Sequence, residues 1–276
     1  MVAKRAQTNT LWVDILGGIR PHFIFAIIGV AVCLCLDSMD TLKMTINNPL
    51  VYQENSVMCV LYFYFNAVSF GGVFSNYFMT ILAAIPFAAS YSIEQNSRFL
   101  IYKISRCERR AYYISKIGVA ALYGGMTTLL GSLLFILILS TYLPLITPAK
   151  LFEMTALPYY DALVLGDGKL YFAIVLFLAF LSGALWGSSG MCASAFIPNP
   201  YVAVCSPFII KFLLVEIGRL LKLPAGVRLD LILNARGLLV SDSITLLTAT
   251  ILVASIILLY YHVFAQRVER RLDDIA

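Results

Sequence analysis

A basic connection between two apolar stretches holds the side chains best suited to ionic contacts with a partner. Residues 92–116 read SIEQNSRFLIYKISRCERRAYYISK and lie between two charge-free runs. Ser92 and Gln95 have the spacing of a capping box, which predicts a helix beginning near residue 93, with exposed aromatic rings and mixed charge suited to a protein partner. A plain positive-inside anchor would account for the cations but not for Glu94, the cap or the length of the segment. The basic residues of this connection are Arg98, Lys103, Arg106, Arg109 and Arg110, of which Arg98, Arg106 and Arg109 are expected to pair with acidic residues of a partner.

The sequence contains no arrangement typical of a catalytic, metal or nucleotide site. It has no G-x-x-x-x-G-K-[ST] phosphate loop, no H-E-x-x-H motif and no G-x-S-x-G motif. His22 and His262 lie at the start of the first apolar run and near the end of the last, where an interfacial histidine is more common than a ligand. The six cysteines include no C-x-x-C pair, so neither a zinc site nor a redox site is predicted. We therefore expect no enzyme activity, cofactor or metal in this chain.

The composition indicates an integral membrane protein. The chain has 276 residues, of which 61% are hydrophobic and 13% are charged, and its mean hydropathy is +0.87. Soluble domains typically carry about 25% charged residues, and a soluble fold of this length leaves roughly a quarter of its extended-chain surface in water. A soluble fold could not cover so much apolar surface. We expect an all-α integral membrane protein that forms a single domain over residues 1–276.

Charge-free runs predict six membrane-spanning helices, since one crossing needs about 20 mostly apolar residues. Residues 55–93 would form a helix about 58 Å long, which is too long for one crossing. We therefore place a span at about 72–92 and expect 55–70 to be an outer re-entrant or interfacial segment. The sequence IPNP at 197–200 separates the fourth span from the fifth. The predicted spans are 21–36, about 72–92, one within 117–149, about 170–194, one beginning near Tyr201, and one within 243–266.

The positive-inside rule orients these spans. Lys4, Arg5 and Arg20 place the amino end in the cytoplasm, and the tail QRVERRLDDIA places the carboxyl end there as well. A single crossing by residues 55–93 puts the basic connection in the cytoplasm, whereas two crossings would put it outside. The single crossing is therefore favoured.

Two amphipathic segments complete the expected fold. Residues 9–20, NTLWVDILGGIR, predict an interfacial helix with Asp14 and Arg20 in water. Residues 211–240 carry five basic residues on the outer side, against the charge rule. We expect them to form two short re-entrant helices before the last span, with long basic side chains that reach the membrane surface.

The order of these elements and one motif resemble the permease subunits of type-2 ATP-binding-cassette exporters. In that family an acidic residue follows the second span, a short helix contacts the ATPase, and a Ser-Arg turn leads to a Ser-Lys pair at the third span. The amino-terminal amphipathic helix, the six spans and the re-entrant helices also fit the family. Many members carry Lys-Gly just after the acidic residue, whereas this chain has Gln95 and Asn96, so the register of the coupling helix differs. The matching positions are Glu94, Ser105, Arg106, Arg109, Tyr113, Ser115 and Lys116.

The resemblance implies the membrane subunit of an ATP-driven exporter in a bacterial cell membrane. ATP and Mg²⁺ would then bind a separate cytosolic ATPase, and the chain would pair with a second copy or a paralogous permease; lipid contacts are expected and nucleic acid is not. Short outer loops and a face rich in Tyr and Phe suit an amphipathic or hydrophobic substrate, such as a peptide antibiotic, a drug or a lipid-like molecule. An ion-coupled secondary carrier or channel, or a membrane immunity or scaffold protein, are the alternatives. The carrier is disfavoured because only Glu216 falls near a predicted span.

The resemblance also implies roles for particular residues. The ATPase would contact the coupling helix and turn at 93–110, with aromatic anchors and a rim of weak ion pairs. The lysine in the fifth span would face either a wet interior or, as an equal alternative, the membrane surface. The predicted ATPase-coupling residues are Glu94, Arg98, Phe99, Tyr102, Arg106 and Arg109. The predicted residues of the substrate path are Asn76, Tyr77, Tyr201, Phe208 and Lys211.

A G-x-x-x-G pair in the fourth span predicts close helix packing. Gly183 and Gly187 lie one turn apart on one helix face, where the absence of side chains lets another helix approach. The neighbouring helix could belong to a second subunit or to the same chain, and the sequence favours neither.

Overall fold

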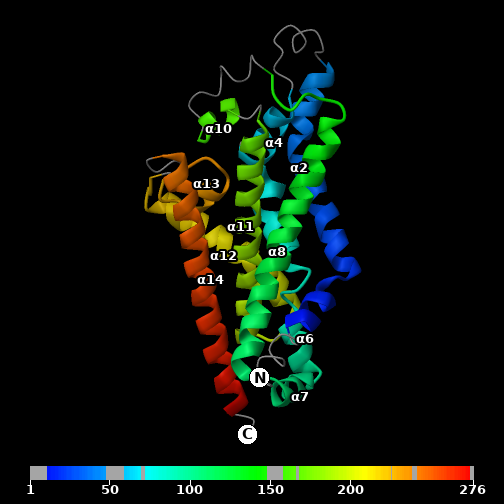
Figure 1. The fold of residues 1–276 in the computed structure, drawn as a ribbon, viewed down its shortest axis with the longest axis vertical. Helices are drawn as coiled ribbons and strands as arrows, with labels where there is room; N and C mark the ends of the chain where they lie inside the picture. Colours follow the sequence, from blue (N-terminus) through cyan, green and yellow to red (C-terminus); the bar gives the residue numbers. More distant parts are fainter. Residues whose placement is uncertain are drawn as a thin grey trace.

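The helices of this chain pack side by side into an elongated bundle (Figure 1). All regular elements within the described residues are helical. This computed structural model describes residues 11–47, 59–69, 72–147, 158–165, 168–224, 226–237 and 241–273.

Five of the described helices are long and apolar enough to cross a membrane. The first candidate span, Pro21–Met39, is the apolar part of the longer helix α2. These five helices are consistent with a helical multi-pass membrane protein, as the composition predicted. They are α2 (Pro21–Asn47), α8 (Arg109–Ser140), α11 (Lys169–Phe196), α12 (Pro200–Leu220) and α14 (Asp242–Asp273).

The expected second span is a broken helix instead of a continuous one. It passes through a π-helix, η1 (Phe74–Phe78), then α5 (Met79–Ala84), a turn at 85–89 and α6 (Ser90–Asn96). Pro86 lies in the turn, where it lacks an N–H group and its ring opposes a regular helix. The segment therefore contains no single helix of spanning length, although the chain follows it from one end of the bundle to the other (Figure 1).

Asp37 of α2 caps the start of this broken helix. Its carboxylate accepts hydrogen bonds from the backbone N–H groups of Phe74 at 3.2 Å and Ser75 at 2.5 Å. The first N–H groups of a helix lack internal partners, so a carboxylate at this place satisfies them. Asp37 lies one residue beyond the predicted span 21–36 but inside Pro21–Met39. The expectation that only Glu216 falls near a predicted span was therefore wrong, because Asp37 lies at the end of the first one.

The expected single helix from residue 93 is divided into two. Helix α6 ends at Asn96, and α7 (Phe99–Arg106) begins after Arg98, whose φ of 57° lies in the left-handed region. The Ser92 hydroxyl donates to the Ala89 carbonyl instead of capping a helix. Glu94 and Phe99 consequently belong to different helices, and the capping-box prediction was wrong.

The segment expected to form two re-entrant helices has a different arrangement. Residues 211–220 continue α12 to its end at Leu220, and a single short helix, α13 (Leu229–Leu233), follows. The expected outer segment at 55–70 contains α4 (Val60–Ser69), and α10 (Tyr160–Leu165) precedes α11. Glu153 and Asp167 of the expected outer loop lie outside the described residues.

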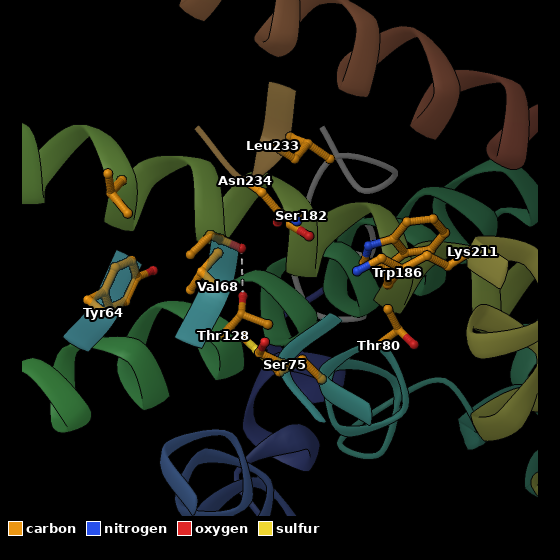
Figure 2. A pocket seen from close by; sticks show the side chains of 13 residues that line it. Tyr64, Val68, Ser75, Thr80, Thr128, Ser182, Trp186, Lys211, Leu233 and Asn234 are labelled. Atoms are coloured by element: carbon orange, nitrogen blue, oxygen red, sulfur yellow. Dashed lines mark hydrogen bonds between the residues drawn. The ribbon is translucent and has the colours of Figure 1, made fainter. Parts of the chain in front are cut away.

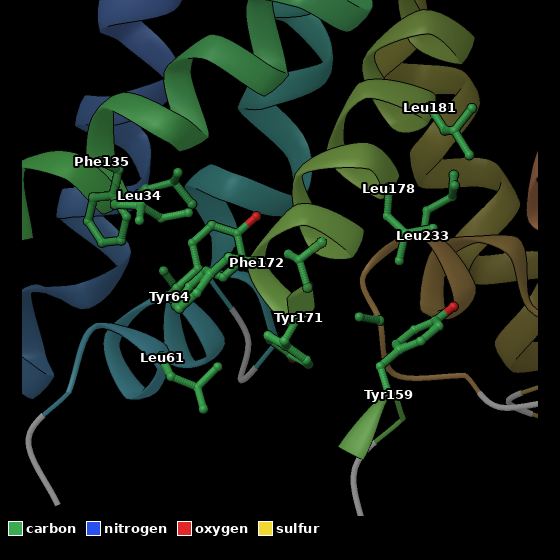
Figure 3. Close-up of a cluster of buried hydrophobic side chains, with 14 of the residues drawn as sticks. Leu34, Leu61, Tyr64, Phe135, Tyr159, Tyr171, Phe172, Leu178, Leu181 and Leu233 are labelled. Atoms are coloured by element: carbon green, nitrogen blue, oxygen red, sulfur yellow. The ribbon is translucent and has the colours of Figure 1, made fainter. Parts of the chain in front are cut away.

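The main core lies in the half of the bundle that carries α4 and α10. Figure 3 shows Leu34 of α2, Tyr64 of α4, Phe135 of α8 and Phe172 of α11 gathered between these helices. Tyr64 lies near the Phe135 and Phe172 rings, at centroid distances of 6.4 and 6.5 Å. Between helices in lipid, such close van der Waals packing is a principal source of association.

Helices α8 and α11 approach each other through facing glycines. A Cβ atom on Gly183 would collide with the Gly124 carbonyl and the Thr128 hydroxyl, and one on Gly187 would lie 2.5 Å from the Ala120 carbonyl oxygen. Thr128 also donates across the contact to the Ala179 carbonyl at 2.8 Å. The G-x-x-x-G pair therefore packs within this chain, which resolves the two alternatives left by the sequence.

Hydrogen bonds define two opposite ends of the bundle. At the α7 end, Arg271 of α14 donates to the Gln95 side chain and to the Phe196 carbonyl. At the other end, the Asp242 carboxylate accepts from the Tyr159 backbone N–H. Figure 1 places α6, α7 and the carboxyl-terminal end of α14 together, and α10 and α13 far from them.

Candidate functional site

Four charged side chains form a cluster at the α7 end, which we call the charge cluster: Asp14, Glu94, Lys103 and Lys116. Lys103 Nζ lies 2.7 Å from Asp14 Oδ1 and 2.9 Å from Glu94 Oε1. Lys116 Nζ lies 2.7 Å from Glu94 Oε1 and 3.5 Å from Asp14 Oδ1. Each lysine therefore contacts both carboxylates, and the formal charges cancel.

Neutral side chains complete the hydrogen bonding of the charge cluster. Tyr112 donates its hydroxyl hydrogen to Glu94 Oε2 at 2.7 Å, and Ser115 donates to Asp14 Oδ2 at 2.7 Å. Lys116 is 1% exposed and also faces the Phe87 ring at 5.0 Å. A buried ion pair is favourable only when geometry and additional hydrogen bonds compensate for lost hydration, and this cluster meets that condition.

Two groups of the cluster lie outside the candidate spans, and their pKa values follow from their neighbours. Burial raises the pKa of Asp14, but Lys116, Lys103 and the Ser115 hydroxyl lower it further, so the net pKa lies below the ordinary value. Burial lowers the pKa of Lys103, but the hydrogen bonds and charges of Asp14 and Glu94 raise it further, so the net pKa lies above its ordinary value. Both groups therefore remain charged at neutral pH.

The charge cluster fixes four elements to one another. Asp14 comes from the amino-terminal helical residues 11–18, Glu94 from α6, Lys103 from α7 and Lys116 from α8. Asp14 was expected in water but is only 5% exposed, and the reason is its pairing with two lysines. Arg20 is exposed, as expected.

Helix α7 presents an apolar surface outward from this fixed position. Leu100 is buried beneath the helix, whereas Phe99 is 54% and Tyr102 66% exposed. Arg98 before this helix, Arg106 at its end and Arg109 at the start of α8 are also exposed. Five of the six predicted coupling residues are therefore accessible at one end, while the Glu94 carboxylate points inward to the charge cluster.

A second group of polar residues lies inside the bundle around Lys211. The side chains of Lys211 and Trp186 lie next to each other at one end of a cavity of about 40 Å³, with Thr80, Ser75, Thr128 and Asn234 along its walls (Figure 2). A cavity of this size has room for about two water molecules. Lys211 is 6% exposed, so it faces the interior of the bundle.

Most of the predicted path residues lie together near Lys211. Asn76 accepts a hydrogen bond from the Asn234 side chain at 3.0 Å, and the Tyr77 ring lies 5.9 Å from the Phe208 ring. Tyr201 is separate from them and lines a cavity of about 810 Å³ at the α7 end. Two cavities therefore lie along the contact between α12 and the broken helix, one toward each end of the bundle.

Sequence reasoning missed the partners of several site residues. Lys116 belonged to the family motif, but Asp14 was not identified as its partner because these two residues are far apart in the chain. A lysine at the edge of a long apolar run requires a counter-charge, and this requirement was the available signal. Trp186 and Asn234 carried no such signal.

Comparisons of the chain with models of known protein families, with curated proteins and with solved structures find no match.

Proposed function

We propose that this chain is the membrane-spanning subunit of an ATP-driven exporter and that a separate cytosolic ATPase binds α7. One observation carries the proposal: a short helix with exposed aromatic side chains is held by an ion pair to Glu94 of α6, which also pairs with Lys116 of the long helix α8. A helix held in this way transmits rigid-body movement when a partner displaces it. An anchor that only retained the chain in the membrane would not need this connection.

Within this proposal the broken helix crosses the membrane in addition to the five long helices, which gives six crossings. Both ends of the chain are cytoplasmic. ATP and Mg²⁺ bind the partner ATPase, and two membrane subunits, either identical or paralogous, surround the path. Several side chains of α12 that face outward, including Ile209, Phe212 and Leu213, are apolar and suit lipid or the second subunit. The cavities at the two ends of α12 suit alternating access for an amphipathic substrate.

Replacing Phe99 and Tyr102 together with alanine should reduce co-purification of the ATPase at least about tenfold. Exposed aromatic residues that fill pockets on a partner commonly carry much of the binding free energy. The measurement is the amount of a co-expressed ATP-binding-cassette ATPase that is retained on the affinity-tagged membrane subunit. Tyr142→Ala is the matched control, because Tyr142 is an exposed aromatic residue outside α7. Equal retention by the double variant and the control would refute docking at α7.

Cys107, between α7 and α8, should be protected from an impermeant thiol reagent in intact cells and should react after the membrane is opened. The test uses a variant in which the other five cysteines are alanine, because Cys205 is also exposed. Thr141→Cys in a cysteine-free background is the control and should react from outside, because Thr141 follows α8 at its opposite terminus. Labelling of Cys107 in intact cells would invert the topology and remove the cytosolic docking helix.

A further inference from the structure

We propose that the cavity beside Lys211 binds the phosphate-bearing headgroup of an anionic membrane amphiphile, whose apolar part lies in an adjoining groove. The inference rests on the proposed function in one respect: the bound amphiphile would be the transported substrate. Binding itself requires this chain alone.

Lys211 is a buried cation that forms no salt bridge with the described residues. Its side chain is 6% exposed, the centroid of the Trp186 ring lies 5.8 Å from Nζ, and Asp230, which pairs with Arg228, attracts it from a longer distance. A charge removed from water is costly unless it is paired, and an aromatic ring compensates only in part. The ammonium group is therefore positioned to gain from an anion.

The cavity next to Lys211 concentrates further positive charge. It has a volume of about 390 Å³, within the range of ligand pockets, and Arg219, Arg228 and Arg236 line it together with Lys211. Among its described lining residues Asp230 is the one acid, and Arg228 pairs with it at 2.7 Å. Arg219 pairs with Glu216 at 3.3 Å, so Lys211 is a positive charge that remains at this cavity to favour a phosphate group.

Polar neutral groups make this cavity a directional site as well as a charged one. Asn76, Tyr77 and Asn234 line the same space, and the bond between Asn234 and Asn76 fixes α13 against the start of the broken helix. Lys211 borders both this cavity and the smaller interior cavity of Figure 2. An anion bound here would therefore contact the interior of the bundle directly.

An apolar groove continues from the charged cavity. It has a volume of about 410 Å³ and shares Arg228 and Asp230 with that cavity, and its walls are otherwise apolar. Leu213 and Ile217 on its wall are half exposed, so the groove opens outward on the candidate span α12. Cations at one side and an apolar channel at the other match the two parts of a phospholipid, in which headgroup and tail are joined.

Trp186 provides a direct optical probe of the site. The sequence contains two tryptophans, so Trp12→Phe leaves Trp186 as the sole indole, and Trp12 is itself mostly exposed. The protein is purified in a neutral detergent and titrated with short-chain phosphatidylglycerol, with phosphatidylcholine of the same chain length, and with inorganic phosphate. We expect a saturable change of Trp186 fluorescence with phosphatidylglycerol at concentrations at least about tenfold below those needed for the other two.

Charge removal at the site should weaken this response. Lys211→Gln should raise the apparent dissociation constant for phosphatidylglycerol at least about tenfold, because it removes the buried cation. Arg219→Gln, at an exposed position that tolerates substitution, should raise it about threefold. Lys169→Gln is the matched control, since Lys169 is exposed at the start of α11 and does not line the cavity, and should change it less than twofold.

The outcomes separate this inference from the proposed function. Equal affinity for phosphatidylcholine, or an unchanged response in both Lys211→Gln and Arg219→Gln, would overturn the anionic site. Equal affinity for inorganic phosphate would overturn the contribution of the groove. Co-purification of the ATPase with Lys211→Gln tests docking at α7 independently, and it should match that of the unmodified chain whether or not phosphatidylglycerol binds.

Discussion

Replacing Lys116 with methionine should destabilise the protein by about 3–5 kcal/mol, because it leaves the buried carboxylate of Asp14 and the partly buried carboxylate of Glu94 with only Lys103 between them. Methionine has similar length, so the loss reflects charge more than volume. The measurement is the midpoint of unfolding in a denaturant titration of the purified protein. Arg110→Met is the matched control: Arg110 is exposed on the same helix, and its replacement should change stability by less than about 0.5 kcal/mol.

A second substitution tests whether charge balance is the cause. Glu94→Gln added to Lys116→Met restores equal numbers of positive and negative groups, since Asp14 and Lys103 remain paired at 2.7 Å. The double variant should therefore be more stable than Lys116→Met alone, a coupling that two independent sites would not show. If Lys116→Met and Arg110→Met unfold at the same midpoint, the charge cluster does not hold α7 in place.

Replacing Gly183 with valine should cost at least about 1–3 kcal/mol by separating α8 from α11. The added side chain would collide with the Gly124 carbonyl, which belongs to the helix backbone and cannot rotate away. The same separation would lengthen the hydrogen bond from Thr128 to the Ala179 carbonyl. The unfolding midpoint measures this effect.

Gly118→Ala is the control for that experiment. Gly118 lies on α8 with nothing within 4 Å of an added Cβ atom, so alanine should leave stability unchanged or raise it by about 0.5–1 kcal/mol through its better helix propensity. Gly183→Val with unchanged stability would mean that α8 and α11 do not touch through these glycines. A change in subunit assembly without a change in stability would instead place the glycine pair between two chains.

Hydropathy was sufficient to locate the long helices, because helices of spanning length depend on local composition. The span at 170–194 corresponds to Lys169–Phe196 and the span near Tyr201 begins at Pro200. The break at 85–89 was less accessible to sequence reasoning: Pro86 was visible, but the Asp37 cap that supports the π-helix comes from another helix.

The location of the α7 site could be predicted from the sequence, but the contacts between its residues could not. Exposed residues such as Phe99 and Tyr102 were recognisable because α7 is amphipathic within a short segment. The break at Arg98 was not recognisable, since arginine rarely adopts a left-handed conformation. The inward orientation of Glu94 depends on Lys103 and Lys116 together, and such three-way contacts leave no pattern in a single sequence.

The turn at Pro86 has a mechanical consequence for the two ends of the molecule. Because this segment is divided into short helices, a displacement of α6 can be absorbed at the turn before it reaches η1. Helix α8 has no such joint: its 32 residues form a rod about 48 Å long that starts beside the charge cluster. A displacement of α7 is thus transmitted by the rigid helix α8 toward the end of the bundle that carries α10 and α13, whereas the broken helix is free to bend at its turn.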